Sequence, residues 1–207
     1  MSKIESLNVK LEVLHAEPDT PTKLDSSYKF TPRETNKVQQ QELSKTVYSH
    51  ISKLHNLIID WNKYRVQGNG AAALIYTSNL PQCEDSYFPS ELKPLMYTLV
   101  EVLDNLHTIV ADTKVLNNQL RALAKLQPSE EPVLVTWSVS KMSETVTEIY
   151  DNIRKEYQLL HNVTENIAHC RDENLLAIYM GTWKTSTYLT PESYAYLFAE
   201  AGLSSVT

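Results

Sequence analysis

The sequence predicts an all-α protein, an elongated helical bundle with a long antiparallel coiled-coil hairpin and short C-terminal helices. Two apolar stripes with alternating three- and four-residue steps predict it, and four glycines in 207 residues disfavour a turn-rich β fold. The first stripe consists of Leu92, Leu95, Leu99, Val102, Leu106, Ile109, Thr113, Leu116, Leu120 and Leu123. The second consists of Val139, Met142, Val146, Ile149, Ile153, Glu156, Leu160, Val163 and Ile167. A short link with two prolines joins the stripes, so the two helices are expected to fold back on each other.

Two domain-level segments are expected. Residues 1–30 form a flexible N-terminal segment, and residues 31–207 form a single helical domain with the hairpin core at about 89–170. Alternating apolar positions within residues 7–13 predict a lone strand, which would need a sheet edge from another chain. The alternative is a disordered tail in which the alternation is accidental.

The first helix is expected to begin at Thr31-Pro32-Arg33-Glu34, which has the pattern of a capping box. Its apolar stripe contains Val47, Ile51, Leu54, Ile58 and Trp61. Because the stripe begins late, the turns with Gln39, Gln40 and Gln41 are expected to protrude or contact something polar. Gly68-Asn69-Gly70 is expected to end the helix, and residues 71–80 to form a separate short helix or helical turn before Pro81.

Two short helices are expected after the hairpin. One follows Asp172 and the other is capped by Thr190-Pro191 and closed by Gly202. Their expected buried faces contain Leu176, Tyr179, Met180 and Trp183 in one helix and Tyr194, Leu197, Phe198 and Ala201 in the other.

The apolar stripe of the first helix is too short to cover the whole hairpin. Each seam of the hairpin is about 40 to 50 Å long, whereas the stripe of the first helix is only about 20 Å long. Either the C-terminal helices fold back over the remainder, or a helix from a partner protein completes a four-helix arrangement. The seam residues proposed for contact with such a partner are Leu106, Ile109, Leu116 and Leu120.

The sequence contains no recognisable catalytic, cofactor or metal motif, so we expect a protein that is not an enzyme. The formal net charge is −6 and basic residues are scattered, which disfavours direct nucleic-acid binding. None of the six histidines forms an H-E-x-x-H motif, and the only two cysteines are far apart. The neighbours His169 and Cys170 are expected to be a helix-end histidine and a small buried thiol. No segment is apolar enough to span a membrane and no signal peptide is apparent, so a soluble intracellular protein is expected.

Several blocks resemble the family of cyclin-dependent-kinase-2-interacting proteins. At the front, residues 55–61 read H-N-L-I-I-D-W, followed by a glycine turn and Ser78-Asn79-Leu80. At the back, the matching positions are Thr136-Trp137, Arg154-Lys155-Glu156, Ala168-His169, Asp172, Leu175, Tyr179 and Trp183. The chain departs from the family pattern by having Ile153 before R-K-E and no glycine after A-H. The resemblance covers the chain from about His55 onward.

The resemblance implies a non-enzymatic adaptor associated with cell-cycle kinases, DNA replication and checkpoint signalling. It also implies a subunit of an AAA+ ATPase complex acting in replisome proteostasis and ribosome maturation, with a small helical protein as immediate partner. The implied location is nuclear, with cytoplasm as a second compartment. Of the matching aromatic residues, Trp61, Trp137, Tyr179 and Trp183 are expected in the core, with partner anchoring by Trp137, Tyr179 and Trp183 as the alternative. A structural coiled-coil tether of a vesicle or microtubule complex is the alternative function.

A candidate phosphorylation site lies in the N-terminal segment. Thr20-Pro21-Thr22-Lys23 has the proline-directed pattern, with a basic residue three positions on, that cyclin-dependent kinases prefer. The alternative is a chance match, because threonine–proline pairs are frequent in linkers.

Overall fold

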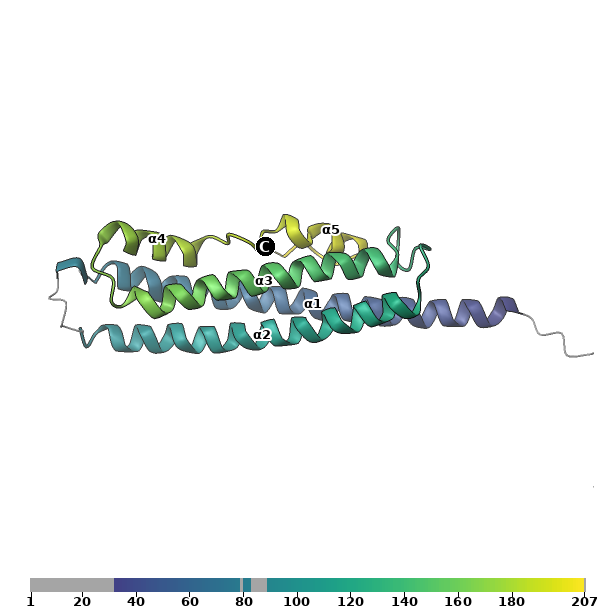
Figure 1. The fold of residues 1–207 in the computed structure, drawn as a ribbon, viewed down its shortest axis with the longest axis horizontal. Helices are drawn as coiled ribbons and strands as arrows, with labels where there is room; N and C mark the ends of the chain where they lie inside the picture. Colours follow the sequence, from purple (N-terminus) through teal and green to yellow (C-terminus); the bar gives the residue numbers. More distant parts are fainter. Residues whose placement is uncertain (1–31, 79, 83–88, 207) are drawn as a thin grey trace, which may run out of the picture.

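The computed structural model describes residues 32–78, 80–82 and 89–206, and these residues form an elongated, all-helical bundle (Figure 1). The fold class predicted from the sequence is therefore confirmed. The helices are α1 (Pro32–Tyr76), the 3-10 helix η1 (Leu80–Gln82), α2 (Leu92–Leu126), α3 (Val139–Ile167), α4 (Glu173–Lys184) and α5 (Glu192–Glu200). The expected lone strand, the Thr31 cap and the Thr20 site lie outside the described residues.

The helices α2 and α3 form the predicted antiparallel hairpin, and their seams face the core. Every seam residue is buried except Leu95 and Leu123, which are partly buried and pack against the core. The link between the two helices ends at Ser138, whose hydroxyl oxygen accepts a hydrogen bond from the backbone N–H of Lys141 at 3.3 Å. This is an ordinary N-cap, so α3 begins where the local sequence favours a helix start.

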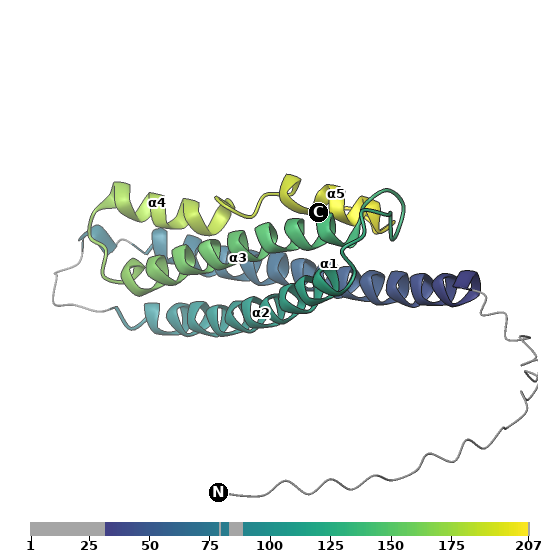
Figure 2. The same ribbon diagram turned by 45° about the vertical axis from the view of Figure 1, so that its right-hand side comes forward.

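Two further layers cover the hairpin. The helix α1 packs against α2, and α4 and α5 lie end to end along α1 and α3 (Figures 1 and 2). The chain thus forms an up-down-up-down four-helix arrangement whose fourth helix is broken into two pieces. Of the two expected ways to cover the hairpin, the structure shows the one in which the C-terminal helices fold back.

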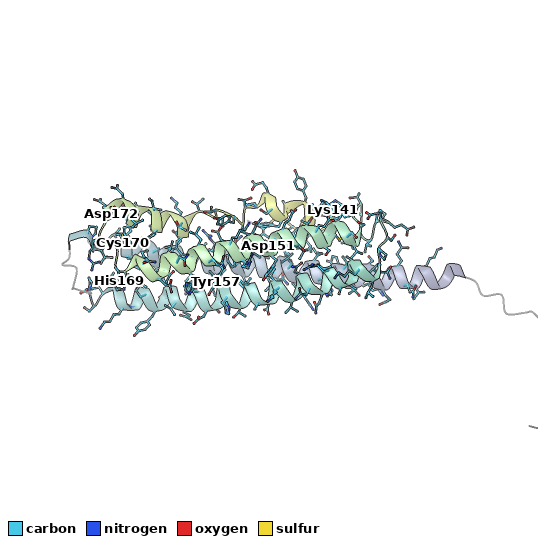
Figure 3. The ribbon with its side chains drawn as sticks, in the orientation of Figure 1. Lys141, Asp151, Tyr157, His169, Cys170 and Asp172 are labelled. Atoms are coloured by element: carbon cyan, nitrogen blue, oxygen red, sulfur yellow. The ribbon has the colours of Figure 1, made fainter. Side chains whose placement is uncertain are left out.

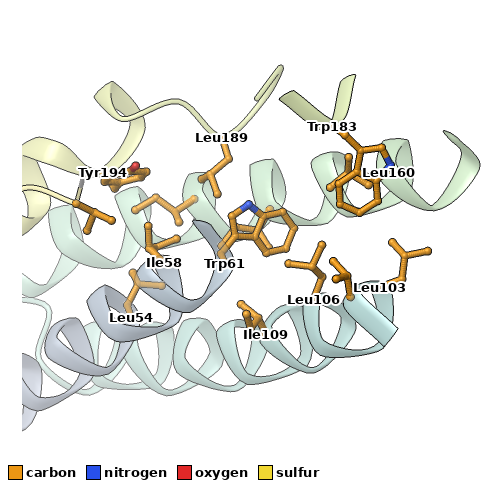
Figure 4. Packing of buried hydrophobic residues seen from close by; sticks show 14 of the residues in the cluster. Leu54, Ile58, Trp61, Leu103, Leu106, Ile109, Leu160, Trp183, Leu189 and Tyr194 are labelled. Atoms are coloured by element: carbon orange, nitrogen blue, oxygen red, sulfur yellow. The ribbon is translucent and has the colours of Figure 1, made fainter. Parts of the chain in front are cut away.

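The core contains side chains from all five α-helices, and Figure 4 shows a part of it. Its largest fully buried side chains are Trp61, Trp183 and Phe198, from α1, α4 and α5. Burying an aromatic or aliphatic side chain of this size contributes roughly 1.5–3 kcal/mol. The C-terminal arm therefore contributes directly to the stability of the domain.

The predicted helix stop at Gly68-Asn69-Gly70 is wrong, because α1 continues through it to Tyr76. Consequently residues 71–76 belong to α1 and not to a separate helix, and η1 is the next helical segment among the described residues. The physical reason is that Ala71, Ala72 and Ile75 are buried and extend the apolar stripe of the helix. Packing of this stripe outweighs the low helix propensity of the glycines.

The start of α1 projects past the hairpin link (Figure 1). Gln39, Gln40 and Gln41 are exposed, as expected. Gln39 and Gln40 also line a pocket with Gln127 and Ser129 of the link, so this part of α1 has polar neighbours.

Both short C-terminal helices form as predicted, but the N-cap of α5 is Pro191, without a capping side chain, so the predicted cap by Thr190 is wrong. The side chain of Asp172 caps α4 by accepting a hydrogen bond from the backbone N–H of Leu175 at 2.9 Å. Gly202, with a φ of 68°, ends the turn after α5 in the left-handed conformation that glycine tolerates best.

Candidate functional site

The seam residues proposed for partner contact are buried inside the chain's own bundle. Leu106 and Leu120 are fully buried, and Ile109 and Leu116 are at most 6% exposed. A partner would reach these four side chains only if the bundle opened. Their assignment to partner binding stays a prediction, whereas their place in the core is what the structure describes.

The three aromatic candidates do not share one surface. Trp183 is buried at the end of α4, while Trp137, before α3, and Tyr179, on α4, are partly buried. The ring of Trp137 has the ammonium group of Lys141 at 5.9 Å from its centre. Tyr179 and Trp137 thus keep some exposure for a partner, and Trp183 does not.

A buried ion pair stabilises the break in the fourth helix, which is the segment 185–191 between α4 and α5. The guanidinium of Arg65 on α1 donates a hydrogen bond to the carboxylate of Glu156 on α3, and both side chains are almost completely buried. Arg65 also donates to the backbone carbonyls of Thr182 and Trp183, each at 3.0 Å. These carbonyls belong to the last turn of α4, where helical partners are missing.

Glu156 accepts hydrogen bonds from backbone N–H groups within the same break. Its carboxylate accepts hydrogen bonds from the backbone N–H groups of Thr187 at 3.0 Å and Tyr188 at 2.7 Å. A buried carboxylate needs such partners, because removing it from water is costly. The ion pair therefore provides hydrogen-bond partners for two sets of backbone groups. Arg65 binds carbonyls at the end of α4, and Glu156 binds N–H groups in the segment that follows.

Gly68 allows α4 to lie close to α1 next to this ion pair. A Cβ atom at position 68 would lie 2.2 Å from Cζ3 of Trp183, a distance that no side chain can adopt. The absence of a side chain on Gly68 thus makes room for the indole. Figure 4 shows Trp183 beside Leu160 of α3.

A second polar cluster anchors the end of α5 to the hairpin link. The carboxylate of Glu200 accepts hydrogen bonds from the backbone N–H groups of Val135 at 2.9 Å, Thr136 and Trp137 at 2.8 Å. The hydroxyl of Thr136 donates a further hydrogen bond at 2.8 Å. Burial alone would raise the pKa of Glu200, but these hydrogen bonds outweigh burial and hold the pKa below its usual value.

The chain after α5 is tied to α1. Nε2 of His55 donates a hydrogen bond to the backbone carbonyl of Ser204 at 2.9 Å, and its ring meets Phe198 edge-on at 4.9 Å. Together with the Arg65–Glu156 and Glu200 contacts, this makes three buried polar attachments of the C-terminal arm.

The neighbours His169 and Cys170 lie in the turn between α3 and α4 (Figure 3). Cys170 is buried, and its thiol donates a hydrogen bond to the carbonyl of Asp172 at 3.3 Å. Within the described part of the chain, no three His, Cys, Asp or Glu side chains are grouped so that they could hold a metal ion. Among the same residues, no helix is long and apolar enough to cross a membrane.

Most of the family-like block from Thr136 to Trp183 has a structural explanation in these contacts. Thr136 and Trp137 bind Glu200, Glu156 binds Arg65, Asp172 caps α4, and Trp183 packs on Gly68. The roles of Arg65, Gly68 and Glu200 were not predicted from the sequence. A signal for the first two was present, because the four- and three-residue steps of the α1 stripe continue from Trp61 through positions 65, 68, 72 and 75.

Comparisons with known proteins show which proteins the chain as a whole is similar to. No family model matches the chain. It is similar to three proteins named cyclin-dependent kinase 2-interacting protein. The Homo sapiens protein is 25% identical over 170 residues, covering 69% of this chain and 80% of that protein. The Mus musculus protein is 22% identical over 166 residues, covering 67% and 78%. The Xenopus laevis protein is 20% identical over 157 residues, covering 65% and 76%. The resemblance inferred from the sequence blocks is thus confirmed.

Proposed function

We propose that this protein is a non-enzymatic, cell-cycle-related adaptor that binds a cyclin-dependent kinase. The observation that carries the proposal is the shared name of the three relatives, together with the block from Thr136 to Trp183. The kinase in that name is cyclin-dependent kinase 2, so a kinase of this class is the first partner to test.

The wider role follows from the same resemblance. The adaptor links cell-cycle kinases with DNA replication and checkpoint signalling in the nucleus, and it also acts in the cytoplasm. It is a subunit of an AAA+ ATPase complex in replisome proteostasis and ribosome maturation, and a small helical protein is its immediate partner. The continuous packed core supports an adaptor role, because a packed scaffold presents partner surfaces in defined positions.

The kinase proposal is tested with purified components. The full chain is titrated with purified cyclin-dependent kinase 2, with and without a cyclin, and binding is followed by calorimetry. Saturable binding is expected, and absence of binding in both titrations would refute the kinase proposal. Incubation of the intact chain with the active kinase and ATP tests Thr20, because a Thr20→Ala variant should lose the label.

The alternative function, a coiled-coil tether, predicts different partners. The full chain, tagged and expressed at its natural level, is recovered from nuclear and cytoplasmic extracts, and the bound proteins are identified by mass spectrometry. AAA+ subunits with replication or ribosome-maturation factors favour the adaptor. Tubulin or membrane-tethering complexes favour the tether.

A further inference from the structure

A pocket lies where the break of the fourth helix meets α1, and we call it the break pocket. It has a volume of about 370 Å³ and is lined by residues of α1, the end of α4, the break, α5 and the chain after α5. An apolar cavity of about 150 Å³ is large enough to bind benzene. The break pocket therefore has room for a small organic ligand with a body larger than one aromatic ring.

Five apolar side chains from separate segments line the break pocket. They are Val66 of α1, Trp183 of α4, Leu189 and Pro191 of the break, and Val206. Trp183 and Leu189 also belong to the core, so packing fixes their positions. The pocket thus offers a preformed apolar wall to the body of a ligand.

The charged side chains in the lining are both cations. Arg65 and Lys184 line the break pocket, and none of the described residues that line it is Asp or Glu. Glu156, the partner of Arg65, is fully buried and does not line the pocket. A pocket lined by charge of one sign favours a ligand of the opposite sign, so the expected ligand is an anion.

Arg65 has hydrogen-bond donors to spare. A guanidinium group has five N–H donors. The hydrogen bonds to Glu156 and to two carbonyls of α4 use at most three of them. At least two N–H groups therefore have no partner among the described residues, although the side chain is only 7% exposed. An anionic oxygen in the pocket would supply an acceptor for such donors.

The charge balance of the lining favours an anion with a single charge. The carboxylate of Glu156 balances Arg65, whereas Lys184 forms no ion pair with any residue that the structure describes. One positive charge is thus left over at the pocket. A carboxylate has one negative charge, while a phosphate monoester has about 1.5 to 2 at neutral pH. A carboxylate therefore matches the lining better.

We propose that the break pocket binds a small carboxylic acid with an apolar body. Its carboxylate binds Lys184 and the spare N–H groups of Arg65, and its body packs against Val66, Trp183 and Leu189. Because the ligand contacts α1, α4 and the break together, it also stabilises the attachment of the C-terminal arm. The inference goes beyond the proposed function, since it concerns a small molecule and does not depend on kinase binding.

The experiment uses the full chain and two probes of nearly the same shape. The first probe is naphthylacetate, and the second is naphthylacetamide, which has no charge. Equilibrium dialysis at low ionic strength measures the affinity of each, and NMR spectra of the methyl groups locate the bound probe. Naphthylacetate is expected to bind with a Kd of about 1 mM or lower and at least about threefold more tightly than the amide. The largest methyl shifts are expected at Val66, Leu189 and Val206.

A matched pair of lysine variants separates the pocket from an ordinary helix end. Lys184 lies in the last turn of α4 and Lys125 in the last turn of α2, where either cation favours its helix, but only Lys184 lines the pocket. Lys184→Gln should weaken naphthylacetate binding by about three- to tenfold and leave amide binding unchanged. Lys184→Arg and Lys125→Gln should bind like wild type. Circular dichroism melting checks that each variant folds.

Four outcomes would overturn the inference. Equal affinity for the acid and the amide would show that the carboxylate has no part in binding. Equal losses in Lys184→Gln and Lys125→Gln would show unspecific attraction by charge. Tighter binding of naphthyl phosphate than of naphthylacetate would show a site for phosphate esters instead. Binding seen only after removal of Thr207 would show that a residue of this chain fills the pocket.

Discussion

Gly68 of α1 lies so close to the indole of Trp183 that a Cβ at position 68 would be 2.2 Å from Cζ3. This contact explains both the glycine within a helix and the placement of α4. We therefore predict that Gly68→Ala is destabilising by about 1–3 kcal/mol, the usual cost of overpacking a core. Urea denaturation followed by circular dichroism measures the change.

Gly70→Ala provides the matched control, because a Cβ at position 70 meets nothing within 4 Å. Alanine favours a helix interior over glycine, so this variant should be more stable than wild type by roughly 0.5–1 kcal/mol. If both variants shifted stability in the same direction, the contact between Gly68 and Trp183 would not explain the glycine.

The second prediction concerns the buried pair of Arg65 and Glu156. Arg65→Met leaves the buried carboxylate without its counter-charge and should cost about 3–5 kcal/mol. The loss should be less than additive with Glu156→Gln, because the two side chains interact directly. A double-mutant cycle from urea denaturation measures the coupling free energy.

The exposed pair of Arg154 and Asp151 is the control for that cycle. Their side chains are about half exposed and the closest charged atoms are 3.6 Å apart. Breaking this pair with Arg154→Met should cost less than about 1 kcal/mol. A cost equal to that of Arg65→Met would contradict a special role for the buried pair.

The contact of Gly68 with Trp183 and the ion pair of Arg65 with Glu156 also show how far the sequence could predict the fold. The hairpin and the C-terminal helices were predictable, because stripes such as Leu99 to Leu120 repeat regularly and Asp172 caps its helix locally. The continuation of α1 through Gly68 was not predicted, since local propensity argued for a stop while the distant Trp183 determined the outcome. Glu156 was placed on the seam, but its partner Arg65 is 91 positions away.

The polar attachment of α5 could not be predicted for the same reason. Glu200 has the appearance of an ordinary charged residue near a helix end, and its four hydrogen-bond donors are more than 60 positions away in sequence. Periodicity reports which residues face the core but not which polar side chains meet there.

The third prediction concerns the pH dependence of the Glu200 contact. The pKa of Glu200 is lowered in the folded state, so its contribution to stability is present above its unfolded pKa of about 4.3 and is lost as the pH falls through the folded pKa. The difference in free energy of unfolding between wild type and Glu200→Gln should therefore be largest near pH 7 and shrink on acidification below about pH 4.3. A difference that stays constant from pH 7 to pH 3 would refute this.

The fourth prediction tests the seam at its centre. Leu106 is fully buried, so Leu106→Asp buries a charge and removes apolar contacts, which should cost several kcal/mol, on the order of 4 or more. The same residue type introduced at an exposed position of the same helix, Val115→Asp, should change the melting temperature little. Equal melting curves for wild type and Leu106→Asp would contradict the position of Leu106 in the core.

The last prediction concerns the one polar member of the first seam. Thr113 is fully buried, and among the described residues its hydroxyl has no hydrogen-bond partner. A buried hydroxyl without a partner costs about 1–3 kcal/mol, and valine has nearly the same shape, so Thr113→Val should stabilise the protein by about 1 kcal/mol or more. Thr164 on α3 is also buried, but its hydroxyl donates a hydrogen bond to the carbonyl of Leu160 at 2.9 Å. Thr164→Val loses that bond and should bring no comparable gain, so thermal melts that shift equally for both variants would contradict an unpartnered hydroxyl at Thr113.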